Sequence, residues 1–374
     1  MNRILFLVQL PPPVHGAAAV NKSIMVSKAV NSAFETLFID ISPAKDMADI
    51  GSFSISKLLA TLFIIFRTLY GYLKFKPNLV YLTLSPHGLA LYKDGLLAII
   101  LKAMGGKLVF HMHGKGIRDE SERSRLKKFI YRLIFKNADV IHLAENLFHD
   151  VNDVRDKSKS ITAISNGIAP FNASPPPAND EIITFIFLSN FMPSKGADIL
   201  IRAAHLIPEM YQSRFRLKLI GSPNDQNHYS EILKLVDEST HGNIQLHGAM
   251  YGNKKFEALR SSQVFVLPTR NECFPLSILE AMSAGLAVIS THEGAIPDIV
   301  ETGVTGELIE HCTPEKLAEK MLIYIADPAY AKKCGGQGFE KFKKQYTIDK
   351  FEEALVSVLA DIISSNSNTA GISR

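Results

Sequence analysis

Two glutamates stand eight residues apart on either side of a Phe-Pro pair. Pro275 suits the first turn of a helix, which would leave Glu272 on a loop and Glu280 one to two turns inside the helix. The carboxylates would then accept hydrogen bonds from separate hydroxyl groups of an extended ligand. The N–H groups of Leu276 and Ser277 offer an anion site at the helix start. Two glutamates at this spacing are common in amphipathic regions, so the spacing alone does not indicate a binding site. The indication comes from the whole arrangement of strand, carboxylate, Phe-Pro, helix and second carboxylate.

Two other loops have the composition of phosphate-binding loops. In the first, Gly16 and Ala17 follow His15 just before a predicted helix, and small residues there let backbone N–H groups approach an anion. A plain tight turn would use the same residues, and the full GxGxxG pattern is absent. In the second, Lys195 precedes a predicted helix, where its ammonium and the helix N–H groups can neutralise phosphates together. An exposed lysine at a helix start is the alternative.

A pair of histidines, His111 and His113, ends a predicted strand. A histidine there can donate a hydrogen bond to a substrate or stabilise developing charge. The His-x-His spacing places both rings on one face of the strand, an arrangement that also suits a metal, although the sequence shows no third ligand. Buried, hydrogen-bonded histidines without a role in binding are the other interpretation.

These loops depend on elements that bring them together, and the chain alternates short apolar strands with helical stretches. Strands are expected at 4–8, 36–39, 79–82, 107–110, 140–143 and 160–164, and again at 183–188, 216–220, 244–246, 264–267 and 287–290. Helices are expected at 58–73, 88–104, 123–135, 197–206, 229–236 and 276–283, and over most of 314–364. Such alternation predicts parallel sheets covered by helices on both faces, which bind ligands beyond the carboxyl ends of their strands.

The chain length predicts two or three domains at about 150 residues each. The alternation indicates a doubly wound α/β domain over residues 1–170, a Pro-rich linker over 171–181 and a second such domain over 182–345. Residues 346–374 are expected to form a C-terminal helix that braces the two domains, followed by a polar tail.

Composition excludes several classes of protein. Hydrophobic residues make up 47% of the chain and charged residues 21%, which is typical of a globular protein and not of a disordered one. The three cysteines are too few and too scattered for a disulfide framework or a Cys-based zinc site. The longest apolar run, residues 58–66, is nine residues long, against about 20 for a membrane span. The apolar run at residues 4–8 is too short for the apolar region of a secretory signal peptide, so a cytoplasmic location is expected.

Charge is unevenly distributed along the chain. Residues 1–170 carry 22 Lys and Arg against 13 Asp and Glu, a formal charge of +9, and the remainder carries −5. A basic first half suits an anionic partner, although solvated lysines at random positions would give the same count.

The order of these loops along the chain resembles that of a known family. The segment from Glu272 to Glu280 looks like the Glu-x7-Glu motif of retaining GT-B glycosyltransferases of glycosyltransferase family 4. Further matches in the family's order are His15-Gly16, His113-Gly114, Asn166-Gly167, Lys195-Gly196, Gly221, His247-Gly248, residues 293–297, and Gly303 with Gly306.

The resemblance implies a GT-B architecture of two Rossmann-like domains facing across a cleft, with the acceptor held by the first and a nucleotide-sugar donor by the second. Glu280 would bind the donor ribose, Glu272 the hydroxyls of the transferred sugar, and Lys195 the diphosphate. Gly16 and Ala17 would lie against that diphosphate. His113 would hydrogen-bond the donor sugar, with His111 as the second choice. The remaining residues implied for donor binding are Asn190, Phe274, Leu276 and Ser277.

One departure concerns the phosphates. The family usually has Gly-Arg where this chain has Ser189-Asn190, so one cation is missing, and Arg270 is a candidate replacement. No Asp-x-Asp pair follows a strand, so neither a metal nor a cofactor is expected.

The implied activity is transfer of a hexosyl or N-acetylhexosaminyl group with retention, from a UDP-sugar rather than a GDP-sugar, in polysaccharide or O-antigen biosynthesis. A non-hydrolysing nucleotide-sugar epimerase and a non-catalytic protein that binds anionic membranes are the alternatives.

Apolar stripes lie beside basic residues such as Lys127, Lys128 and Arg132 in two segments, residues 58–76 and 123–136. These stripes suit either a core-facing helix or one that lies on an anionic lipid surface. The family's frequent use of polyprenyl-diphosphate carriers favours a lipid-linked acceptor and peripheral association with the inner face of the cell membrane. No nucleic-acid partner is expected.

Overall fold

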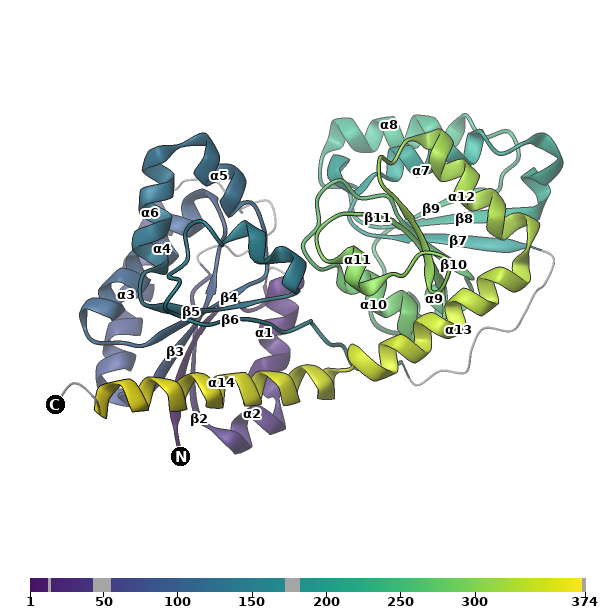
Figure 1. Ribbon diagram of the computed structural model, residues 1–374. Coiled ribbons are helices and arrows are strands. Elements are labelled where there is room, and N and C mark those ends of the chain that lie inside the picture. Colours follow the sequence, from purple (N-terminus) through teal and green to yellow (C-terminus); the bar gives the residue numbers. More distant parts are fainter. Residues whose placement is uncertain (13–14, 43–54, 172–181, 372–374) are drawn as a thin grey trace. The chain divides into compact units, whose positions relative to one another are not determined.

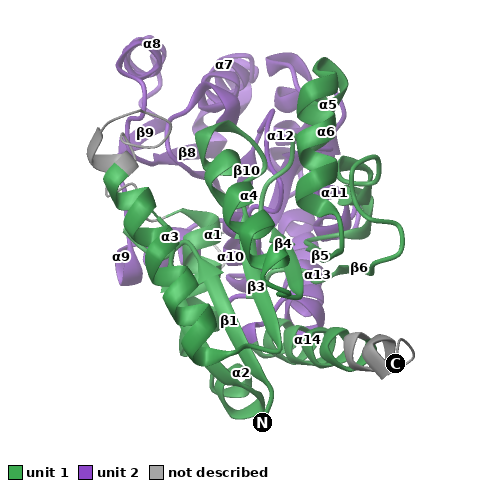
Figure 2. Cartoon of the chain, turned by 90° about the vertical axis from the view of Figure 1, so that its left-hand side faces the viewer, with its two compact units in different colours: residues 1–167, 349–374 green, residues 168–348 purple. Residues whose placement is uncertain are grey.

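The computed structural model describes residues 1–12, 15–42, 55–171 and 182–371. The chain divides into two compact units (Figures 1 and 2). Unit 1 comprises Met1–Gly167 and Asp349–Arg374, and unit 2 comprises Ile168–Ile348. The expected linker, from residue 172 to residue 181, lies outside the described residues, and the bracing role of the terminal helix stays a prediction.

Unit 1 is built on a parallel sheet of six strands in the order β2-β1-β3-β4-β5-β6. The strands are β1 (Arg3–Val8), β2 (Glu35–Asp40), β3 (Leu79–Leu84), β4 (Leu108–Met112), β5 (Ala138–His142) and β6 (Ile161–Ala163). The α-helices are α1 (Gly16–Val26), α2 (Lys28–Ala33), α3 (Ile55–Phe75), α4 (Gly88–Ala103), α5 (Ile117–Arg123), α6 (Arg125–Phe135) and most of α14 (Ile348–Gly371).

Unit 2 repeats this plan with a parallel sheet in the order β12-β11-β10-β7-β8-β9. Its strands are β7 (Ile183–Leu188), β8 (Phe215–Ile220), β9 (Ile244–His247), β10 (Val264–Leu267), β11 (Ala287–Thr291) and β12 (Gly306–Ile309). Its α-helices are α7 (Ala197–His205), α8 (Gln226–Asp237), α9 (Gly252–Arg260), α10 (Leu276–Ser283), α11 (Ile296–Ile299), α12 (Pro314–Ala326) and α13 (Pro328–Gln345).

The central strands explain why the sequence folds this way. Every residue of β3, β4, β5, β10 and β11 is buried, as is β1 from its second residue onward. Parallel strands covered on both faces are near-continuous apolar runs, because neither face meets water. The predicted fold of two doubly wound α/β domains is confirmed.

The predicted strands agree with the observed ones to within two residues at each end. The helices α2, α5, α9 and α11 and the strand β12 were not predicted. In α9 only Leu259 is buried, so the helix lacks an apolar period, and β12 is a four-residue strand that contains a glycine and a glutamate. No described helix is both long enough and apolar enough to cross a membrane.

Candidate active site

The loop between β10 and α10 carries the first glutamate of the motif. Glu272 lies on this loop, and Glu280 lies in the second turn of α10. Pro275 is the N-cap rather than the first helical residue, and no side chain caps the helix. The first backbone N–H groups of a helix have no partner within it, so those of Leu276 and Ser277 face the loop region as potential donors.

Lys195 meets Glu272 although the two residues are 77 positions apart in the chain. The Lys195 ammonium donates a hydrogen bond to the Glu272 carboxylate, and each side chain is less than one-fifth exposed. Lys195 ends the 3₁₀ helix η3 (Pro193–Lys195) on the loop that follows β7. Because β7 and β10 are neighbouring parallel strands, their following loops meet at the carboxyl edge of the sheet.

Backbone contacts hold these two loops together. The Arg270 N–H and the Thr269 hydroxyl both donate to the Ser194 carbonyl, at 2.8 and 3.0 Å. Gly196 has a φ of 77°, and a Cβ there would lie 2.2 Å from the Pro268 carbonyl oxygen. Only glycine fits this approach, so the position of the lysine is set by the backbone.

The second glutamate also has a lysine partner. Lys255 of α9 donates to Glu280 at 2.6 Å, and both side chains are about one-fifth exposed (21% and 19%). Lys255 was not among the predicted site residues, because it lies on a polar helix that was not predicted. Each glutamate of the motif is therefore paired with a lysine from another loop or helix.

The remaining predicted residues of unit 2 lie close to these pairs in the chain but differ in burial. Asn190 follows β7 and is partly exposed. Phe274 is 6% exposed, and its ring centroid lies 6.2 Å from that of Tyr346, so its side chain packs in the interior. Arg270 donates to the Pro193 carbonyl at 2.6 Å, which places its guanidinium beside η3.

In unit 1, the loop after β1 leads directly into α1. His15 is the N-cap of α1 and Gly16 its first residue, followed by Ala17. The Ala18 N–H donates to His15 Nδ1 at 3.4 Å, and burial lowers the pKa of His15. An accepting Nδ1 in a neutral ring leaves the proton on Nε2, so His15 keeps one N–H donor.

The histidine within β4 and the one directly after it have different environments. His111 is fully buried and shares a hydrogen bond with the Tyr81 hydroxyl. His113 directly follows β4, and its ring lies beside that of His111, tilted by 40° with 4.1 Å between ring centroids, as expected for side chains two positions apart along an extended chain. Neither ring nitrogen of His113 has a hydrogen-bond partner among the described residues. Burial lowers the pKa of His113 to about 3, so the ring is neutral and can donate one hydrogen bond and accept another.

A third histidine, which was not among the predicted site residues, ends the neighbouring strand β5. His142 is buried, and its Nδ1 accepts from the Leu143 N–H at 2.9 Å. Burial, followed by the charge of a protonated His113, lowers the pKa of His142 to about 3. Among the residues that the structure describes, no group of three or more His, Cys, Asp or Glu side chains is placed to hold a metal ion.

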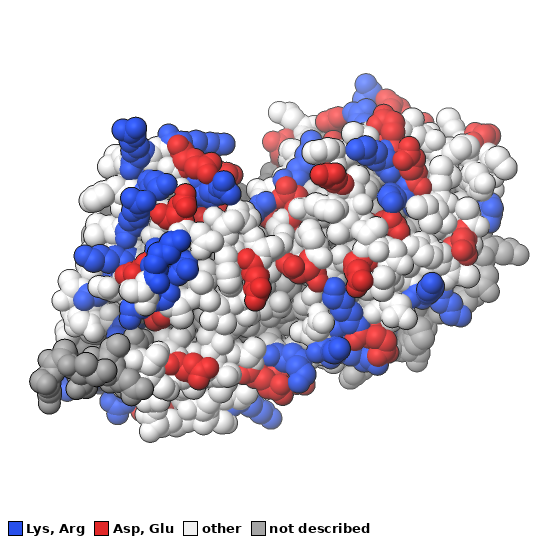
Figure 3. Space-filling model, viewed as in Figure 1, with Lys and Arg blue, Asp and Glu red and all other residues white. Residues whose placement is uncertain are grey.

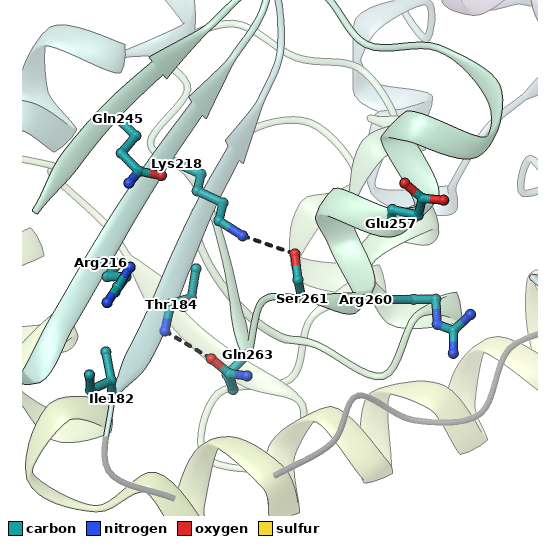
Figure 4. A pocket seen from close by; sticks show the side chains of 9 residues that line it. All are labelled: Ile182, Thr184, Arg216, Lys218, Gln245, Glu257, Arg260, Ser261 and Gln263. Atoms are coloured by element: carbon teal, nitrogen blue, oxygen red, sulfur yellow. Dashed lines mark hydrogen bonds between the residues drawn. The ribbon is translucent and has the colours of Figure 1, made fainter. Parts of the chain in front are cut away.

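A hollow of about 590 Å³ in unit 2 lies elsewhere (Figure 4). It is lined by residues near the beginnings of strands, among them Thr184, Arg216 and Gln245. Figure 4 shows the Lys218 side chain pointing to Ser261, to which it donates at 2.9 Å. The paired lysines and glutamates follow the carboxyl ends of the strands, so this hollow is separate from the candidate active site.

Residues 170–341 match the family model described as glycosyl transferases group 1. That segment is therefore similar to the glycosyltransferase group 1 family. It contains Lys195, Lys255 and both glutamates of the motif.

Two relatives that are similar in sequence match only part of this chain. The uncharacterized glycosyltransferase MJ1178 of Methanocaldococcus jannaschii is 33% identical over 230 residues, 60% of each chain. The lipopolysaccharide core biosynthesis mannosyltransferase LpcC of Rhizobium leguminosarum bv. viciae is 31% identical over 107 residues, 29% of this chain and 30% of that protein. The chain thus spans less than two thirds of the length of either relative.

A solved structure extends the likeness of fold to almost the whole chain. The structure of Anabaena Alr3699/HepE in complex with UDP matches with a TM-score of 0.73 and 16% identity, over 96% of this chain and 100% of that one. At this identity the match shows a shared fold. The fold of this chain is thus that of known GT-B glycosyltransferases.

Proposed function

We propose that this protein is a retaining glycosyltransferase that moves a hexosyl or N-acetylhexosaminyl group from a nucleotide sugar, a UDP-sugar in preference to a GDP-sugar, to a glycan acceptor. The observation that carries the proposal is the pairing of each glutamate of the motif with a lysine, within a segment that is similar to the glycosyltransferase group 1 family. UDP bound to the HepE structure supports the choice of nucleotide.

In this proposal, Lys195 acts on the leaving group. The bond between the anomeric carbon and the diphosphate breaks, and negative charge develops on the diphosphate oxygens. Preorganised cations and N–H dipoles stabilise such charge. Lys195 and the first N–H groups of α10, at Leu276 and Ser277, supply these donors, with Asn190 as a neutral neighbour. Arg270 is the candidate for the missing cation, because its guanidinium lies beside η3.

The glutamates bind hydroxyl groups of the donor. Glu272 takes the hydroxyls of the transferred sugar and Glu280 those of the ribose. An ion pair already orients each carboxylate before the donor arrives, so binding requires little rearrangement of the two side chains.

In unit 1, His113 is the histidine proposed to bind the donor sugar, because its ring nitrogens are uncommitted among the described residues, whereas His111 bonds Tyr81. Gly16 and Ala17 would offer the N–H groups at the start of α1 to the diphosphate. The reaction needs no metal or other cofactor in this proposal.

The acceptor is proposed to be a growing glycan on a polyprenyl-diphosphate carrier, in the synthesis of O-antigen or another surface polysaccharide. The similarity to LpcC, a lipopolysaccharide core biosynthesis mannosyltransferase, supports a polysaccharide pathway. The proposed location is the cytoplasm, at the inner face of the cell membrane.

The test incubates the purified protein with UDP-glucose, UDP-N-acetylglucosamine or GDP-mannose and follows release of the nucleoside diphosphate by mass spectrometry. We expect slow hydrolysis of one UDP-sugar, accelerated by a polyprenyl-diphosphate glycan, and loss of turnover in Lys195→Ala. Formation of an epimeric nucleotide sugar without any acceptor would overturn the proposal in favour of an epimerase. Absence of turnover with every donor would favour a non-catalytic protein.

A further inference from the structure

Three helices of unit 1 present apolar side chains to solvent. On α3 the exposed residues are Leu59, Leu62, Phe63, Phe66, Tyr70 and Leu73, each more than half exposed. On α4 they are Leu89, Tyr92 and Leu96, and on α6 they are Leu126, Phe129 and Leu133. Neighbours within each set are mostly three or four positions apart, which places them in one stripe along each helix. We call these twelve residues the outer apolar face.

These stripes are not needed for the core of unit 1. The opposite sides of the same helices pack on the sheet, through Ile64 of α3, Leu97 of α4 and Ile134 of α6. The helix α3 is therefore apolar on both sides. Single exposed apolar residues are ordinary on a protein surface, but a contiguous set marks an interaction site.

The three stripes form one surface because the helices are neighbours. The helix α4 contacts both α3 and α6. Figure 2 shows α3, α4 and α6 on the side of unit 1 that faces the viewer. The outer apolar face thus extends across one layer of helices, over a single face of the sheet.

The charges around this face are positive. Neither α3 nor α6 contains an acidic residue, and Asp94 of α4 is fully buried and paired with Lys93. Exposed cations on or next to the stripes are Arg67, Lys74, Arg125 and Lys136. Lysines and arginines gather over α5 and α6 in Figure 3, with acidic residues among them.

Two of the three acidic residues of α5 form ion pairs within the protein, and the third, Asp119, is exposed. Glu120 pairs with Lys127, and Glu122 pairs with Arg118 at 2.8 Å. Lys128 lies 3.4 Å from Asp153. Lys127 and Lys128, which the sequence suggested for membrane contact, are therefore already paired. Arg125 and Lys136, which have no side-chain partner among the described residues, are better candidates.

We propose that the outer apolar face docks on an anionic phospholipid membrane. Its aromatic and aliphatic side chains would enter the boundary between headgroups and acyl chains, while the surrounding cations contact lipid phosphates. A second copy of the chain fits less well, because a twofold interface through this face would bring like charges together. The docking surface belongs to unit 1 alone, and its test does not depend on the proposed transfer reaction.

The experiment is co-sedimentation with vesicles of phosphatidylcholine and phosphatidylglycerol in equal parts, compared with pure phosphatidylcholine. We expect binding to the mixed vesicles that weakens as salt is added. The double variant Phe63→Ser/Phe66→Ser should weaken binding roughly tenfold or more, because two aromatic side chains no longer enter the membrane. Arg125→Gln and Lys136→Gln should each weaken it by about fivefold.

Matched controls come from unit 2. Met210→Ser removes an apolar side chain that is 74% exposed, and Lys332→Gln removes an exposed cation. Neither should change vesicle binding, and circular dichroism should show all variants folded. Wild-type protein that stays in the supernatant with the mixed vesicles at low salt would overturn the proposal. So would a dimer in light scattering that Phe63→Ser/Phe66→Ser converts to a monomer while vesicle binding is absent, because the occupant would then be a second copy.

Discussion

Replacing Glu280 by Ala separates a donor-binding role from a purely structural one. The Glu280 carboxylate accepts from Lys255 at 2.6 Å and is proposed to accept from the donor ribose as well. A charge-assisted hydrogen bond contributes about 1.5 to 3 kcal/mol, so Glu280→Ala should weaken donor binding roughly ten- to hundredfold. The stability cost should be smaller, about 1 kcal/mol or less, because the ion pair is partly exposed and screened by solvent.

The assay is isothermal titration calorimetry with the nucleotide sugar that the wild type turns over, beside thermal unfolding. Glu257→Ala is the matched control, because Glu257 is an exposed glutamate on the same helix as Lys255. It should leave donor affinity unchanged.

A double variant resolves the remaining ambiguity. If Glu280 acts only by neutralising Lys255, then Lys255→Met/Glu280→Ala should regain wild-type affinity, because neither charge is left unpaired. If Glu280 contacts the ribose, the double variant should bind as weakly as Glu280→Ala. Recovery in the double variant, or unchanged affinity in Glu280→Ala, would refute the ribose assignment.

Three other predictions address the chemistry and the buried histidines. Lys195→Ala should lower kcat more than it raises KM, because the lysine acts on charge that grows as the diphosphate leaves; a change in KM alone would indicate uniform binding instead. Activity should persist in EDTA, and complete loss restored by magnesium or manganese would contradict the metal-free proposal. Burial lowers the pKa values of His111, His113 and His142, so below pH 6.5 the unfolded chain takes up protons that the folded chain does not, and stability should fall as pH falls. Between pH 7 and pH 4, His142→Gln should make the free energy of unfolding depend less steeply on pH, by up to about 1.4 kcal/mol per pH unit, as measured by urea unfolding. An unchanged pH dependence would show that His142 does not contribute to it.

The sequence alone determined every described strand except β12, most helices and the local placement of the motif. Buried parallel strands are continuous apolar runs, and this pattern can be read without any tertiary contact. The placement of Glu272 on a loop and Glu280 inside a helix follows from a proline five positions before the second glutamate, which is a local effect.

Only the tertiary structure decided which side chains meet. The pairing of Lys195 with Glu272 depends on β7 and β10 being neighbours, and Lys255 reaches Glu280 from a helix with no apolar period. The helix α3 is apolar on both sides, so its sequence could not tell which stripe packs on the sheet and which faces solvent. Periodicity reports where side chains point around a helix axis, but burial depends on what other segments place against them, and that information is not local.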